Sequence, residues 1–143
     1  MAAQRTAEAV WEGSLVDGNG TVSMISSGAF GEFPVTWAAR AESPGGKTSP
    51  EELMAAAHAA CYAMALSHHL TGQGSTPERL HVSVTYTFVP GTGITAADIA
   101  VSGSVPGLSA DEFEQMAREG EQSCPVSNAV RNNVQLSLVA SLD

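Results

Sequence analysis

Positive charge is scarce in this chain of 143 residues: six Lys and Arg residues stand against 15 Asp and Glu residues, which gives a net charge of −9. A surface of this sign repels phosphate backbones, and the basic stripe typical of nucleic-acid binders is missing. We therefore expect neither a nucleic acid nor a membrane surface as a partner. A small substrate or a soluble partner fits the charge better.

Long apolar runs are also absent, since none approaches the roughly 18 residues that suggest a membrane span. Residues 1–10 lack the apolar stretch of a signal peptide, so a cytoplasmic location is expected. The hydrophobic fraction of 43% and the charged fraction of 15% are those of an ordinary globular protein. The length predicts a single domain over residues 1–143.

Only two cysteines are present, Cys61 and Cys124. Taken alone, they could be two unrelated buried thiols or a functional pair. A static disulfide is not expected in a reducing cytosol, so any pairing would be transient and chemical. His58, Cys61 and His68 share one face of a helix, but without a C-x-x-C or H-E-x-x-H motif we expect no metal site. These histidines are expected to pair with the backbone or with carboxylates instead.

The strands are predicted from the alternation of apolar and polar side chains. The Asp-Gly and Asn-Gly dipeptides of residues 17–20 predict a hairpin, because its turn needs positive φ. The expected strands cover residues 7–15, 21–25, 33–40, 80–89, 99–105 and 134–140. The predicted fold class is α+β, with antiparallel strands first and last and one unusually apolar helix between them.

That helix begins at Pro50, with Ser49 as N-cap and Glu52 completing a capping box, and it ends by Gly72. Residues 53–70 are rich in Ala and apolar nearly all round, so we expect burial on most sides, in the core or at a subunit interface. A second capping box in residues 109–112 predicts another helix, ending with Gly120 as C-cap.

The two thiols differ in their expected environments. Cys61 lies inside the apolar helix, where burial without help raises the pKa of a thiol and leaves it inert. Cys124 precedes Pro125, which opens a short third helix, and a helix N-terminus favours thiolate. On electrostatics alone, Cys124 is the more reactive candidate.

Two segments resemble the cysteine motifs of the OsmC/Ohr family: SPEELMAAAHAAC over residues 49–61 and CPVSNA over residues 124–129. Residues 11–13, 20–22 and 27–30 are similar to the OsmC branch. The resemblance spans essentially the whole chain. It implies an intertwined homodimer in which antiparallel sheets wrap around central apolar helices.

The same resemblance implies a peroxidase of organic hydroperoxides, with Cys61 as the peroxidatic and Cys124 as the resolving cysteine. Glu51 matches the family's glutamate ten residues before the first cysteine, and Arg40 matches its arginine, although the neighbours of Arg40 match only loosely. Arg40 would hold the Cys61 thiolate and Glu51 would orient the guanidinium. No cofactor is needed, and an external dithiol, lipoyl-type or thioredoxin-like, would reopen the disulfide.

Glu51 and Cys61 are ten residues apart, which is roughly 15 Å along a continuous helix. Either the helix is interrupted or Glu51 of a second chain meets Cys61 of the first, and the apolar helix favours the second arrangement. An alternative function remains open: a binding module for a small apolar ligand, with thiols that only sense redox state.

Overall fold

The computed structural model describes residues 1–143, and the chain divides into two units, residues 1–53 and residues 54–143. The first unit holds the elements β1 (Glu8–Glu12), β2 (Asn19–Ser23), β3 (Phe33–Val35) and α1 (Trp37–Ala41). Helix α2 (Pro50–Gly72) begins in the first unit and continues through the second. None of the helices combines the length and the hydropathy of a membrane-spanning segment.

Strands β1, β2 and β3 form an antiparallel sheet in that order. A hairpin between β1 and β2 is confirmed, because Glu12 pairs with Asn19. Its turn, however, spans residues 13–18 and not 17–20: Asn19 and Gly20 already belong to β2, and the turn glycine with positive φ is Gly13. The first strand is shorter than expected and ends before Gly13, whose φ of +92° is a conformation that strands do not use.

The third strand was predicted to continue to Arg40, and this prediction is wrong. The strand stops at Val35, and the next residues form the short helix α1. The Thr36 side chain caps this helix by accepting a hydrogen bond from the backbone N–H of Ala39 at 3.1 Å. A capped, Ala-containing segment favours helix over the alternating pattern that suggested a strand.

Helix α2 has the predicted bounds, Pro50–Gly72. Ser49 Oγ accepts from the backbone N–H of Glu52 at 3.1 Å, as an N-cap should. The Glu52 carboxylate, however, accepts from the Thr48 hydroxyl at 2.7 Å. Thus the Ser49 cap is present, but the Glu52 side chain is engaged by Thr48.

Only one face of α2 is buried in the single chain, by residues at every fourth position: His58, Tyr62, Leu66 and Leu70. Met64, on another face, is 68% exposed. The expectation of burial on most sides is therefore not met within one chain. The subunit-interface alternative stays open.

The second unit contains the sheet β4 (Arg79–Val89), β5 (Gly93–Ser104) and β6 (Gln135–Leu142), in that order. Strands β4 and β5 are antiparallel, but β5 and β6 are parallel, which corrects the antiparallel expectation for the last strand. The connection between them carries α3 (Ala110–Gln122) and α4 (Pro125–Val130) and is long enough to return the chain in the same direction. The α+β class is confirmed.

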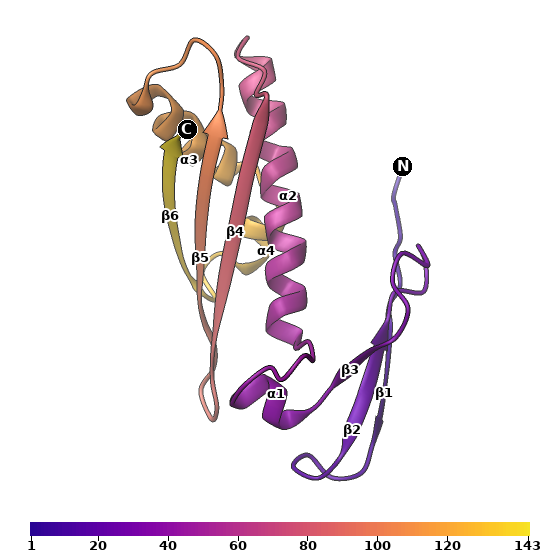
Figure 1. The fold of residues 1–143 in the computed structure, drawn as a ribbon. Helices are drawn as coiled ribbons and strands as arrows, with labels where there is room; N and C mark the ends of the chain where they lie inside the picture. Colours follow the sequence, from indigo (N-terminus) through magenta and orange to yellow (C-terminus); the bar gives the residue numbers. More distant parts are fainter. The chain divides into compact units, whose positions relative to one another are not determined.

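One hydrophobic core joins α2, β5 and α3, and the helices lie on one face of the sheet (Figure 1). Its centre includes Tyr62, Leu66, Ile99, Phe113 and Cys124, all at most 2% exposed. This core holds α2 and the segment that contains the second cysteine against the same sheet.

Gly120 was predicted to end the second helix, but α3 continues to Gln122 and Ser123 is its C-cap. A Cβ at position 120 would lie 3.0 Å from Leu66 Cδ1 and 3.2 Å from Leu66 Cα. The glycine is therefore explained by the close approach of α3 to α2. The Ser109–Glu112 capping box at the other end of α3 is confirmed.

Candidate active site

Cys61 of α2 and Cys124 of the α3–α4 turn meet in the second unit. Both are free thiols, and the Cys61 side chain is hydrogen-bonded to that of Cys124. The two cysteines are 63 residues apart in the chain (124 − 61). The fold thus brings together the two sulfurs singled out in the sequence.

Burial raises the pKa of the Cys61 thiol, as the sequence predicted for a cysteine inside an apolar helix. A backbone hydrogen bond from Val126 acts in the opposite direction, while the neighbouring Cys124 raises the pKa further. Within this unit the Cys61 thiol is therefore held in its protonated form at neutral pH. A nearby cation would be needed to stabilise the thiolate.

Cys124 is the N-cap of α4, as Pro125 predicted. Its Sγ accepts a hydrogen bond from the backbone N–H of Ser127 at 3.5 Å. Cys124 is 0% exposed, whereas Cys61 is only partly buried. Of the two thiols, Cys61 is thus the more accessible to a small molecule, although helix-terminus electrostatics favoured Cys124.

Arg40 and Glu51 form an ion pair in the first unit, between α1 and the first turn of α2. Arg40 donates from Nη2 to Glu51 Oε1 at 2.8 Å, and from Nε to Oε1 at 3.0 Å and Oε2 at 3.2 Å. The Glu51 side chain is only 8% exposed. The carboxylate therefore fixes the orientation of the guanidinium.

A cavity of about 470 Å³ adjoins this arginine within residues 1–53. Its lining is apolar apart from Arg40 and Thr36, and comprises Ala9, Trp11, Leu15, Val22, Val35, Thr36, Trp37, Arg40, Pro50 and Leu53. An apolar wall with one guanidinium suits a ligand that has a hydrocarbon body and a polar end.

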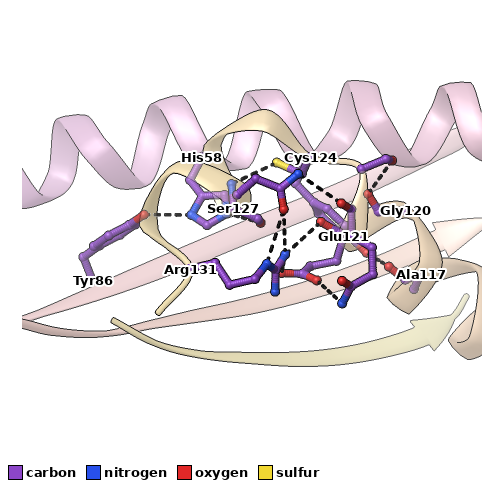
Figure 2. A network of polar contacts seen from close by, with 12 residues as sticks. His58, Tyr86, Ala117, Gly120, Glu121, Cys124, Ser127 and Arg131 are labelled. Carbon is purple, nitrogen blue, oxygen red and sulfur yellow. Dashed lines mark hydrogen bonds and ion pairs between the residues drawn. The ribbon is translucent and has the colours of Figure 1, made fainter. Parts of the chain in front are cut away.

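A buried hydrogen-bond network beside Cys124 was not predicted (Figure 2). His58 Nδ1 lies 2.8 Å from the Tyr86 hydroxyl, and His58 Nε2 lies 2.7 Å from Ser127 Oγ. The expectation that His58 pairs with the backbone or a carboxylate is therefore wrong, because its partners are hydroxyls. His68 is exposed, whereas His58 is fully buried. Only the Ser in the CPVSNA segment and the position of His58 one turn before Cys61 hinted at this network.

A family model described as OsmC-like protein matches residues 43–139. The chain belongs to the OsmC-like protein family. This OsmC-like chain is 34% identical to peroxiredoxin OsmC of Escherichia coli over 95% of its own length and 96% of that protein. It is 31% identical to the organic hydroperoxide resistance protein of Xanthomonas axonopodis pv. citri, over 66% of its own length and 67% of that protein.

The solved structures agree with the family assignment. The organic hydroperoxide resistance protein of Elizabethkingia anophelis superposes with a TM-score of 0.72 at 25% identity and covers 100% of both chains. The fold predicted from the cysteine motifs, OsmC-like and α+β, is thereby confirmed.

Proposed function

We propose that this chain is a thiol peroxidase that reduces organic hydroperoxides to alcohols, with Cys61 as the attacking thiol and Cys124 as the resolving thiol. The observation that carries the proposal is the contact between these two reduced thiols. Adjacent thiols can close a disulfide with little backbone movement. The names of the relatives, a peroxiredoxin and an organic hydroperoxide resistance protein, support peroxide chemistry.

The difference in exposure supports this division of roles. Cys61 is partly exposed and can be reached by a hydroperoxide, while Cys124 is fully buried behind it. A buried second thiol is protected from direct oxidation and is still in contact with the first. Cys124 therefore suits the resolving role.

The Arg40–Glu51 pair would supply the positive charge that the Cys61 thiolate needs. A guanidinium stays charged at any relevant pH, so it offsets the effect of burial on the Cys61 pKa. Helix α2 is continuous from Pro50 to Gly72, so the alternative of an interrupted helix between Glu51 and Cys61 is not supported. We infer that Arg40 and Glu51 of one chain serve Cys61 of another chain in a homodimer.

Exposed apolar side chains support the homodimer. Large hydrophobic residues lie at the surface of the single chain: Val10, Trp11, Leu15, Val16, Ile25, Phe30, Phe33 and Met64 are among them. So much exposed apolar surface is unusual for a monomer and typical of an interface.

The proposed reaction has two steps in the protein. The Cys61 thiolate attacks one peroxide oxygen, the O–O bond breaks, and the alkoxide takes up a proton and leaves as the alcohol. Cys61 is then a sulfenic acid. The Cys124 sulfur displaces its hydroxyl group, which leaves as water with the Cys124 proton, and the S–S bond forms. An external dithiol, lipoyl-type or thioredoxin-like, reduces this disulfide.

An alkyl or aryl hydroperoxide is favoured as substrate over hydrogen peroxide. The apolar cavity beside Arg40 supports this choice, since an alkyl or aryl group gains by leaving water and hydrogen peroxide has no such group.

One equivalent of cumene or tert-butyl hydroperoxide tests the proposal. The reduced chain should lose about two daltons as an intramolecular disulfide forms. Cys61→Ser should abolish turnover, and Cys124→Ser should stop at the sulfenic acid and then over-oxidise. A Cys61→Ser variant with full turnover would contradict the proposal. If hydroperoxide leaves the wild type unchanged, the result favours the alternative function, a binding module for a small apolar ligand.

A further inference from the structure

His58 and Ser127 join the same two helices as the thiols do. His58 lies three residues before Cys61 on α2, and Ser127 lies three residues after Cys124 on α4. Figure 2 shows His58 and Ser127 beside Cys124, joined by the 2.7 Å hydrogen bond between His58 Nε2 and Ser127 Oγ. By sequence spacing, this bond is about one helical turn from each of the two cysteines.

This bond links α2 and α4 in a fully buried position. His58, Ser127 and Cys124 are each 0% exposed, and Ser127 is the buried residue of α4. A helix of six residues is too short to be stable by itself, so α4 depends on tertiary contacts.

The other side-chain hydrogen bonds of α4 and its C-cap end on nearby residues of the chain. Asn128 donates to the Gln122 carbonyl at 3.1 Å, and Arg131 donates to Glu121 and to Asn128. These bonds close the turn upon itself but do not reach α2. The His58–Ser127 bond does reach it, and it joins two side chains, whereas the other hydrogen bond between α4 and α2 runs from the Val126 backbone to Cys61. The His58–Ser127 bond therefore helps to fix the position of α4 relative to the helix that carries Cys61.

The first turn of α4 contacts both sulfurs. The Ser127 backbone N–H donates to Cys124 Sγ, and the Val126 backbone is hydrogen-bonded to Cys61. A shift of this turn would therefore change the surroundings of both thiols at once.

We propose that His58 is a positioning residue for disulfide closure: through Ser127 it holds the first turn of α4 so that the Cys124 sulfur faces Cys61. Its place in the catalytic cycle rests on the proposed function. In that step the Cys124 sulfur bonds to Cys61, the S–O bond of the sulfenic acid breaks, and the hydroxyl leaves as water with the Cys124 proton.

Two matched variants separate positioning from a general loss of stability. Ser127→Ala and Tyr86→Phe each remove one hydroxyl and one hydrogen bond of His58, but only Ser127 belongs to α4. Equilibration in glutathione redox buffers measures the effective concentration of the two thiols without any peroxide. Ser127→Ala should lower it about tenfold or more, while Tyr86→Phe should stay within about threefold of the wild type. Ser127→Thr, which keeps the hydroxyl, should recover part of the loss.

An equal fall in both variants, or no fall in Ser127→Ala, would overturn the proposal. If Ser127→Ala does not fold, His58→Asn replaces it, because Asn retains a polar group near the position of Nδ1 and none near that of Nε2. Hydroperoxide treatment is the second measurement, and Ser127→Ala should convert a larger share of Cys61 to sulfinic acid than Tyr86→Phe does. A wild type that closes the disulfide in glutathione but does not reduce hydroperoxide would contradict the proposed function. The comparison of Ser127→Ala with Tyr86→Phe in glutathione would still test the positioning role of His58.

Discussion

Arg131 donates to the Glu121 carboxylate at 2.8 Å, across the turn that contains Cys124. The Glu121 side chain is 8% exposed and that of Arg131 is 29% exposed. In addition, the Cys124 backbone N–H donates to the Glu121 carbonyl at 3.1 Å. The resolving-cysteine candidate is thus held in a turn whose two ends are tied together by a largely buried ion pair.

Removing Arg131 should destabilise the protein, because Glu121 would be left buried without its partner. We expect Arg131→Met to lower the free energy of unfolding by about 2 kcal/mol in urea titrations. Arg118→Met is the matched control: its ion pair with Glu114 is 57% and 48% exposed and should contribute less than about 0.5 kcal/mol. Equal losses of unfolding free energy in the two variants would show that the Arg131–Glu121 pair contributes no more to stability than an exposed ion pair does.

Stability should fall in mild acid because of His58. Burial lowers the pKa of its imidazole, although the Glu121 charge raises it. The unfolded chain takes up a proton near pH ~6.5 and the folded chain only at lower pH. The contribution of His58 is therefore complete above that pH and is lost as the pH falls toward the folded pKa. Urea titrations at a series of pH values should show this loss in the wild type and a smaller one in His58→Gln. His68→Gln, which removes an exposed imidazole, should leave the acid loss in place.

The reactivity of Cys61 should depend on Arg40. In a Cys124→Ser background, the pH profile of iodoacetamide alkylation reports the Cys61 pKa. Arg40→Met should move the midpoint to higher pH, because burial raises this pKa and the proposed cation would be gone. Arg118→Met, which removes an exposed arginine, should leave the midpoint in place. An unchanged midpoint in Arg40→Met would exclude Arg40 as the stabilising charge.

The prediction of one domain can be tested with intrinsic probes. Both tryptophans, Trp11 and Trp37, lie in residues 1–53, whereas most helical residues lie in residues 54–143. If the chain unfolds as one domain, fluorescence and far-ultraviolet circular dichroism should give coincident thermal transitions. Two separate midpoints would show that the units unfold independently.

Local signals in the sequence were sufficient to predict most of the helices and strands. Ser49 and Pro50 marked the start of α2, and the Ser109–Glu112 pair marked the start of α3, because capping depends on neighbours in the chain. The role of Gly120 was not predicted correctly because its reason is tertiary: a Cβ there would lie only 3.0 Å from the Leu66 side chain of another helix.

The candidate site was predictable only through its motifs. From their spacing alone, Cys61 and Cys124 could be two unrelated thiols or a functional pair. The prediction that they form a pair came from the family resemblance. The partners of His58 lie 28 and 69 residues away, so no local pattern could identify them. The direction of β6 was missed for the same reason, since a strand's alternation does not tell which way it runs beside its neighbour.

The parallel pairing of β6 with β5 closes the connection that carries Cys124. The α3–α4 segment is anchored to the sheet at both ends, by β5 before it and by β6 after it. Removal of β6 would leave the segment that carries Cys124 tethered to the sheet at its β5 end alone.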